Sequence, residues 1–509
     1  MNFLNFILAL VPIIWLIIAM MVLKWTTWKA ALGSAVIAAV EALLIWHTPV
    51  SVIGLSALEG ICMALWPIVL VIVAAVFTYN LVCRSGGMDV IKRLLTSLSS
   101  DKRVIVLLVA WCFGGFMEGM AGFGTAIAIP AGMLVGMGFP ALFSCLICLV
   151  ANGNPTPWGS IGIPTVTLAN VVGFENSISL STMQAIQTAF FMILTPVILV
   201  MITGKGIKAM KGMWGITLAS GISMVIPMIL VSYFVGAELV MVIASVCSLL
   251  ITGFMAKRMK PNPEYEMEMP EQTGKLGLKE IAVACAPFLF IFVFLLGTSK
   301  LVMPINTYLD QFSSSITFVE GQSPVKFAWI NTPGVWIFLS AILGAWIQKV
   351  PVSVFMEVLK ATIKQMSGSI YVMLSVLSCA KIMIYSGMIA EIAAFIIAVT
   401  GSIYPFFAPW LGCLGTFVTG SGTSSSVLFG QVQLNAATAL NMDPYWIVGL
   451  NSLGVGAGKM MSPQSLSIAL SAVDKQGEDS KLLKMVLPYG IGYLALMSIV
   501  AIAGSMIIG

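Results

Sequence analysis

Apolar runs of roughly the length of a membrane span recur from one end of the chain to the other. A helix crosses about 30 Å of hydrocarbon with roughly 20 predominantly apolar residues. The uninterrupted runs are Phe3–Leu23, Ala30–Trp46, Ile61–Val82, Ala189–Thr203, Met213–Phe234, Leu239–Phe254, Ile281–Thr298, Val335–Ile347, Ser369–Tyr385 and Met485–Ile508. Two further apolar segments, 104–170 and 404–472, contain clusters of glycine and hydroxyl side chains. The pattern predicts an all-α polytopic membrane protein with about 12–14 transmembrane segments.

The composition leaves lipid as the solvent for most of the chain. Of the 509 residues, 59% are hydrophobic and 9% are charged, which no soluble fold of this size accommodates. The first run is expected to be a permanent span, because it lacks the basic start and the small-residue cleavage site of a signal peptide. The net charge of +5 is expected to reflect loops on the cytoplasmic side, with the lipid bilayer and no nucleic acid as partner.

The cysteines and the single histidine do not point to a metal or redox centre. Cys145 and Cys148 have the spacing of a redox motif, but they lie in FSCLICLV, which is typical of a helix interior. Cysteines in such a context are small core residues. We therefore expect no metal and no cofactor.

Short motifs of the first half return in the second half at a nearly constant separation. The matched pairs are PVSV at 49–52 and 351–354, Gly87–Met88 and Gly387–Met388, G-x-G-T at 122–125 and 420–423, Asn152 and Asn451, and Pro164 and Pro463. Because the pairs stay in register over a long stretch, they indicate an internal repeat. A duplicated channel or structural protein would show the same repeat.

The charges of equivalent loops indicate that the two repeats are inverted. The basic residues of 83–103 (Arg84, Lys92, Arg93, Lys102 and Arg103) have no counterpart in 386–403, whereas Lys475, Lys481 and Lys484 have none in 171–182. Cytoplasmic loops carry the excess of lysine and arginine, so equivalent loops are expected on opposite faces of the membrane. The same count predicts that both termini lie outside.

The repeats and the basic loops divide the chain into three parts. Residues 1–205 form the first inverted repeat, and 279–509 form the second. Residues 206–278 supply two extra helices and a cytoplasmic linker. The linker contains PNPEYEMEMPEQTGK, a long soluble stretch that we expect to be flexible.

Each repeat contains two polar elements that break a membrane helix. They are EGMAGFGTA (118–126), NGNPTPWGS (152–160), TGSGTSSS (419–426) and NSLGVGAGKMMSPQS (451–465). Broken backbone at membrane depth is tolerated only around a cavity lined by protein or water. The residues expected to permit the breaks are Gly122, Gly124, Gly420, Gly422, Pro155 and Pro463. Close helix packing explains isolated glycines equally well, but not such clusters of hydroxyl groups.

The broken elements predict a binding site for a small anion. Half-helix N-termini present free N–H groups and a positive dipole to the cavity, and hydroxyl or amide side chains can bind the oxygens of the ligand. The predicted substrate-binding residues are Lys459, Thr419, Ser421, Thr423, Ser424, Asn152, Asn154, Ser462 and Gln464. Lys459 is the candidate partner of a substrate carboxylate. Alternatively, Lys459 extends its ammonium group to the inner interface of the membrane.

Glu118 is the candidate proton carrier. It directly precedes the broken element, and a carboxyl group in a poorly solvated cavity can load and release a proton near neutral pH. Alternatively, it caps a helix or forms a salt bridge. Other charges within or near apolar runs are interpreted as structural; they are Glu41, Glu59, Glu238, Lys381 and Glu391.

The blocks GFMEGMAGFGTAIAIPA, FVTGSGTSSSVLF and GAGKMMSPQSLSIALSAV resemble the lactate permease family. The resemblance extends over essentially the whole chain. It implies a symporter of the bacterial-type cytoplasmic (inner) membrane that takes up L-lactate, and often D-lactate and glycolate, with protons. It also implies membership of the ion-transporter superfamily, whose inverted repeats contain re-entrant hairpins. The chain departs from a related sequence that reads TGSDTSS, because it has Gly422 at the acidic position.

We therefore expect a secondary active transporter that takes up a small 2-hydroxymonocarboxylate together with H⁺. A sodium-coupled carboxylate symporter is the alternative, because hydroxyls and unwound carbonyls also coordinate Na⁺ and the acidic group at position 422 is missing. An anion channel is a further alternative. An enzyme is not expected, since no nucleophile–base pair or nucleotide motif is present. Preference among hydroxy acids, stereospecificity and oligomeric state stay open.

Overall fold

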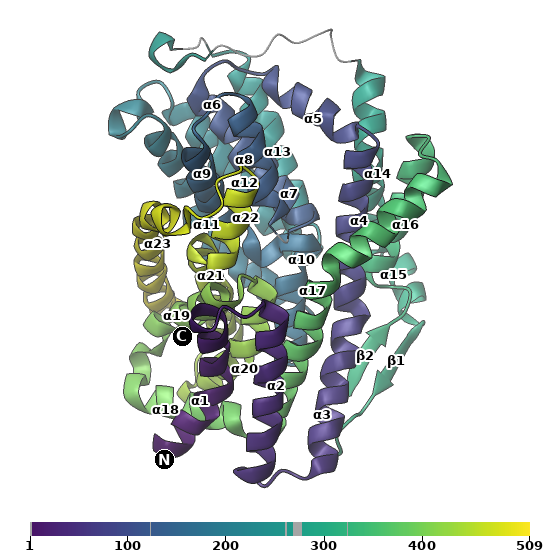
Figure 1. Cartoon of the computed structure of the whole chain (residues 1–509), viewed down its shortest axis with the longest axis vertical. Coiled ribbons are helices and arrows are strands. Elements are labelled where there is room, and N and C mark those ends of the chain that lie inside the picture. The colour runs from purple at the N-terminus through teal and green to yellow at the C-terminus, as the bar shows by residue number, and fades with distance from the viewer. Residues whose placement is uncertain (1–2, 123, 260–261, 268–276, 323, 509) are drawn as a thin grey trace.

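Helices form almost all of the chain, as the apolar pattern predicts (Figure 1). The computed structural model describes residues 3–122, 124–259, 262–267, 277–322 and 324–508. The helices up to residue 256 are α1 (Phe3–Ile17), α2 (Thr27–Leu44), α3 (Val50–Met63), α4 (Leu70–Arg84), α5 (Gly87–Thr96), α6 (Lys102–Val106), α7 (Gly114–Met120), α8 (Thr125–Gly136), α9 (Ala141–Gly153), α10 (Gly159–Val171), α11 (Ile178–Thr203), α12 (Trp214–Phe234) and α13 (Val240–Ala256).

The remaining helices complete the bundle. They are α14 (Leu278–Thr298), α15 (Met303–Asp310), α16 (Pro333–Ile347), α17 (Val352–Tyr385), α18 (Met388–Thr400), α19 (Tyr404–Thr419), α20 (Gly422–Leu440), α21 (Pro444–Met461), α22 (Pro463–Ser471) and α23 (Asp479–Ile508). Short π-helical segments at Ile18–Val22, Ala64–Val69 and Leu107–Phe113 continue α1, join α3 to α4 and join α6 to α7. Within the described residues, ten helical segments are long and apolar enough to cross a membrane, and α8, α9, α13 and α16 are shorter apolar helices. The prediction of an all-α polytopic membrane protein is confirmed.

The predicted repeat pairs helices of the first half with helices of the second in the same order. The joined pair α3–α4 corresponds to α17, and α5 and α18 each follow a left-handed glycine, Gly86 (φ +80°) and Gly387 (φ +90°). Equivalent helices also exchange neighbours: α2 packs on α17 and α4 on α16, while α5 packs on α14 and α1 on α18. In Figure 1, α1 rises from the bottom of the view, whereas α14 descends from the top.

One small sheet interrupts the helices. Strands β1 (Ser313–Ile316) and β2 (Val325–Ala328) pair antiparallel, with Ser313 opposite Ala328, in the long connection between α15 and α16. The indole N–H of Trp66 donates to the Ala328 carbonyl at 2.8 Å. The hairpin is thereby attached to the junction of α3 and α4, which is broken because Trp66 leaves the helical region (φ −134°, ψ 117°).

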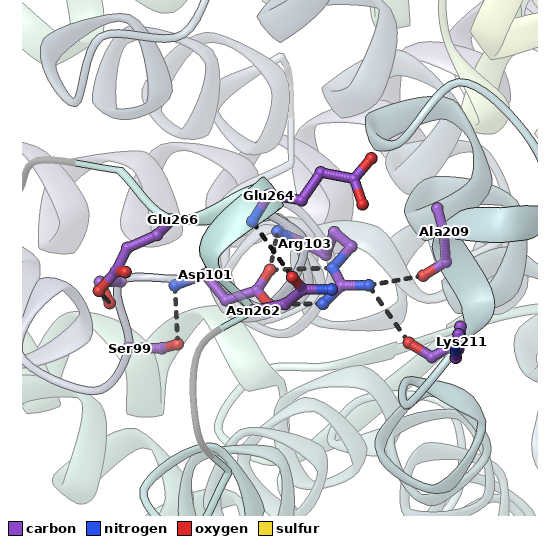
Figure 2. A network of polar contacts seen from close by, with 9 residues as sticks. Ser99, Asp101, Arg103, Ala209, Lys211, Asn262, Glu264 and Glu266 are labelled. Atoms are coloured by element: carbon purple, nitrogen blue, oxygen red, sulfur yellow. Dashed lines mark hydrogen bonds and ion pairs between the residues drawn. The ribbon is translucent and has the colours of Figure 1, made fainter.

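The start of α6 is anchored by a buried ion pair (Figure 2). Arg103 donates through Nη2 and Nε to the two oxygens of Asp101 at 2.6 and 3.0 Å, and through Nη1 to the Ala209 carbonyl at 2.8 Å. The guanidinium also lies 4.0 Å from the ring centroid of Tyr265. The described linker residues 262–267 are therefore packed against the helical bundle, contrary to the expectation of a free chain there; residues 268–276 lie outside the described part.

Replacing Arg103 by alanine should destabilise the protein. The Asp101 carboxylate would stay buried without its cation, which costs about 3–5 kcal/mol. Thermal unfolding in detergent measures the change. Lys92→Ala is the control, because its ion pair with Asp89 is exposed and such pairs contribute about 0–1 kcal/mol. Equal melting temperatures for the two variants would contradict this interpretation.

Candidate functional site

Two of the polar elements break the chain at left-handed glycines. In the first half, Gly122 (φ +57°) and Gly124 (φ +86°) lie between α7 and α8. In the second half, Gly420 (φ +67°) lies between α19 and α20. Side chains with a Cβ disfavour this conformation, so glycine permits the chain to leave one helix and start the next. The Ser421 hydroxyl accepts the N–H of Ser424 at 3.3 Å and thus caps α20.

The other two elements break in different ways. Within the first turn of α10, Ser160, Ile161 and Gly162 have positive φ angles of 47°, 57° and 75°. A non-glycine residue in this conformation costs on the order of 1–3 kcal/mol, and such strain often accompanies functional sites. Between α21 and α22, Ser462 is extended, and its hydroxyl accepts the N–H of Ser465 at 3.1 Å.

A buried ion pair connects the two halves of the chain at these breaks. Lys459 Nζ on α21 lies 2.6 Å from Glu118 Oε1 on α7, and the two side chains are 7% and 2% exposed. Asn152 donates through Nδ2 to the other Glu118 oxygen at 2.9 Å. Both carboxylate oxygens therefore have a partner. Gly159 leaves the space for this arrangement, because a Cβ there would overlap Glu118 Oε1.

The ion pair lies in the wall of a cavity of about 300 Å³. The helix breaks and the middle of α17 contribute the other walls. Lining residues are Thr26, Thr27, Trp28, Glu118, Gly124, Thr156, Gly159, Ser160, Pro164, Gln365, Gly368, Ser369, Val372, Met373, Thr419, Gly420, Ser421, Gly422, Thr423, Lys459, Gln464, Ser465 and Ile468. This central cavity joins a cation, a carboxylate, two helix N-termini (α20 and α22) and several hydroxyl groups, a combination suited to a small polar anion.

The structure brings most of the sequence-predicted site residues to the central cavity. Those in its wall are Lys459, Thr419, Ser421, Thr423, Gln464, Glu118, Gly124, Gly420 and Gly422. Asn152 lies behind Glu118 as its hydrogen-bond donor. The alternative that Glu118 takes part in a salt bridge is also realised, and its partner is the predicted substrate ligand Lys459.

Other predicted residues lie outside the wall. Asn154 donates to Thr195 at 2.9 Å, and Ser462 caps α22. The Ser424 hydroxyl is buried and has no hydrogen-bond partner. Gly122, Pro155 and Pro463 shape the breaks, with Pro463 at the first position of α22.

Gly422 begins α20 in ordinary helical geometry and does not need glycine for its backbone angles. A Cβ at this position would lie 2.9 Å from Val455 Cγ1 and 3.1 Å from Thr156 Cγ2. These side chains occupy part of the space that an acidic side chain would need. The packing around position 422 therefore favours glycine over an acidic residue.

Several residues that line the central cavity were not predicted from the sequence. Thr156 and Ser160 belong to the polar element at 152–160, and Ser465 belongs to the element at 451–465. These three residues could therefore have been predicted from the sequence. Gln365 and Ser369 lie inside a long helix; their only signal is the polar cluster KQMSGS next to an apolar run.

Comparison with known proteins matches residues 5–508 to the family model described as L-lactate permease. The chain belongs to the L-lactate permease family. An L-lactate permease of Streptococcus iniae is 42% identical over 87% of this chain and 92% of its own length. One of Salmonella typhimurium is 32% identical over 98% and 95%, and the glycolate permease GlcA of Escherichia coli is 30% identical over 98% and 95%.

Membership of the family makes the chain a multi-pass membrane transporter and not an enzyme. Among solved structures, the YdaH transporter of Alcanivorax borkumensis is similar with a TM-score of 0.47 and 16% identity, over 88% of this chain and 87% of that one. MtrF of Neisseria gonorrhoeae has a TM-score of 0.46 and 13% identity, over 89% and 84%.

A double-mutant cycle tests the coupling of Glu118 and Lys459. Glu118→Gln or Lys459→Met alone should lower the free energy of unfolding by about 3–5 kcal/mol, because each leaves a buried charge uncompensated. The double variant should recover most of this loss. Thermal unfolding of the full chain in nanodiscs measures the cycle. Lys326→Met is the control, because its ion pair with Asp310 is about half exposed. Additive single losses would show that the two groups are independent.

Proposed function

We propose that the protein is a secondary active transporter that takes up L-lactate, D-lactate and glycolate by proton symport across the cytoplasmic membrane. The names of the relatives, L-lactate permease and glycolate permease, support this substrate class. The observation that carries the proposal is the Glu118–Lys459 ion pair in the wall of a polar cavity.

Substrate binding exchanges the partner of Lys459. The carboxylate of the hydroxy acid takes the place of Glu118 beside the ammonium group, and the N-termini of α20 and α22 add positive potential. Ser421, Thr423 and Gln464, all in the wall, hydrogen-bond the carboxylate and the 2-hydroxyl group.

Charge balance then couples the substrate to a proton. Glu118 without a cation would be an isolated buried charge, which costs far more than its protonation. Each bound carboxylate therefore requires that one proton bind to Glu118. The loaded site has the same net charge as the empty one, so the transport cycle is electroneutral.

The transport cycle uses two inverted repeats, 1–205 and 279–509, with 206–278 as the extra helices and linker and both termini outside. The recurring helix order and the opposite directions of α1 and α14 (Figure 1) support this arrangement. The broken elements of both repeats meet at the central cavity, where inverted-repeat transporters bind their substrates. Rocking of one repeat against the other opens the cavity to each side in turn.

Uptake by proteoliposomes tests the coupling ion. An inward proton gradient should drive accumulation of labelled L-lactate above equilibrium, and a membrane potential alone should not. Counterflow without a gradient is the control for intact protein. A requirement for Na⁺ would instead support the sodium-coupled alternative, for which the absence of an acid at Gly422 is the specific observation. Flux without uphill accumulation would support a channel.

Gly159→Ala should impair transport without straining the backbone. Gly159 has an extended backbone (φ −63°, ψ 154°) that alanine adopts freely, but the new Cβ would displace the Glu118 carboxylate from Lys459. We expect the kcat/KM for lactate uptake to fall roughly 10-fold or more, as for loss of one charge-assisted contact. Gly136→Ala is the matched control, since its Cβ would meet nothing within 4 Å. Equal uptake by both variants would contradict the placement of Glu118 in the mechanism.

A further inference from the structure

A second cavity, of about 240 Å³, lies away from the central one. Its walls come from the start of α11, the connection between α12 and α13, the end of α14, α15 and the start of α16. Among the described residues, none lines both cavities. The loop charges assign these connections to the outside of the membrane. We call this space the outer cavity.

Two helices begin at the outer cavity. α11 starts after Ser177 and α16 after Thr332, and neither of these N-cap side chains caps its helix. Both N-cap residues lie in the cavity wall. The N–H of Ile178 at the start of α11 already donates to the Asn176 side chain at 3.0 Å, but the positive dipole ends of both helices favour an anion there.

Unsatisfied donors in the same wall point to a ligand. Thr332 is 3% exposed, and its hydroxyl has no hydrogen-bond partner. The indole N–H of Trp336, one turn along α16, is also buried without a partner. Buried polar groups are normally satisfied, so two free donors beside one cavity require an explanation. Lys300, also in the wall, adds a positive charge.

Glu238 is the acidic group in the wall of the outer cavity. Burial raises the pKa of Glu238 above its ordinary value, while backbone N–H groups of Glu238 and Ala237 and the Lys300 ammonium act in the opposite direction. Its negative charge is therefore weakened and partly balanced within the cavity. The group can accept a hydrogen bond from a hydroxyl without excluding an anion.

We propose that the outer cavity is a second binding site for a small 2-hydroxymonocarboxylate, which it holds before the substrate reaches the central cavity. The carboxylate accepts hydrogen bonds from Thr332, Trp336 and Lys300, and the 2-hydroxyl donates to Glu238. This inference rests on the proposed function for its substrate class.

The chain next to the outer cavity packs against the strained backbone of the central site. A Cβ at Gly162 would lie 2.5 Å from the carbonyl oxygen of Ala237, the residue before Glu238. Gly162 ends the left-handed segment that starts at Ser160 in the central wall.

Equilibrium binding of labelled L-lactate to the full chain in nanodiscs tests the inference. The natural protein should bind two molecules per chain. Thr332→Val removes one donor with little change of shape and should weaken one of the two sites roughly 10-fold to 100-fold, as expected for a lost hydrogen bond to a charged group. Trp336→Phe should act on the same site. Thr298→Val is the matched control, because Thr298 lines the same cavity but its hydroxyl already donates to the Phe294 carbonyl at 2.8 Å.

Uptake measurements distinguish a failure of this inference from a failure of the proposed function. Thr332→Val should raise the KM for lactate and leave kcat unchanged, because the central cavity is intact. One lactate per chain with normal uptake, or Thr332→Val indistinguishable from Thr298→Val, would overturn the outer site alone. Absence of both binding and uptake in the natural protein would overturn the proposed function and this inference with it.

Discussion

The buried ion pair between Glu118 and Lys459 is the interaction on which the site depends. Each group is on a different half of the chain, and each is almost wholly removed from solvent. Neither charge is tolerable alone in such a place, because the desolvation of an unpaired ion costs several kcal/mol. The pair therefore links α7 to α21. Any anion that separates the two groups must supply the missing charge, and a proton must neutralise the carboxylate.

The helix breaks bring backbone N–H and hydroxyl groups to the cavity that contains this ion pair. A continuous helix at 114–136 or 404–440 would close all of its backbone hydrogen bonds and present only side chains to the cavity. The left-handed residues Gly124 and Gly420 end one helix and begin another at the level of the ion pair. Some hydroxyls are already used by their own helix, as when Thr419 donates to the Gly415 carbonyl at 2.7 Å. The Ser421 hydroxyl accepts the N–H of Ser424 and donates to no other described residue, so its proton is available to a ligand.

The helical architecture could be predicted from the sequence because each membrane span of a lipid-embedded chain must be a long apolar run. The sequence also marked Glu118 and Lys459 separately, since a charge within such a run is expensive. It could not show that they pair, because they lie 341 positions apart and no local pattern records that contact. The strain at Ser160 and Ile161 was equally hidden, since neither residue type predicts a positive φ. Gln365 and Ser369 line the cavity because α17 lies beside the breaks, a tertiary contact that the polar cluster KQMSGS alone does not predict.

A second buried pair shows how Glu118, the proposed proton carrier, differs from another intramembrane carboxylate. Glu59 on α3 lies 2.8 Å from Lys381 on α17, and the Tyr385 hydroxyl donates to both Glu59 oxygens at 2.9 Å. None of these three side chains lines the central cavity, so a substrate there has no access to Lys381. The pair keeps its charges balanced throughout and joins α3 to α17. Of the two pairs, only Glu118–Lys459 lies in the wall of the central cavity. In the proposed mechanism, that contact lets an incoming carboxylate compete for the lysine.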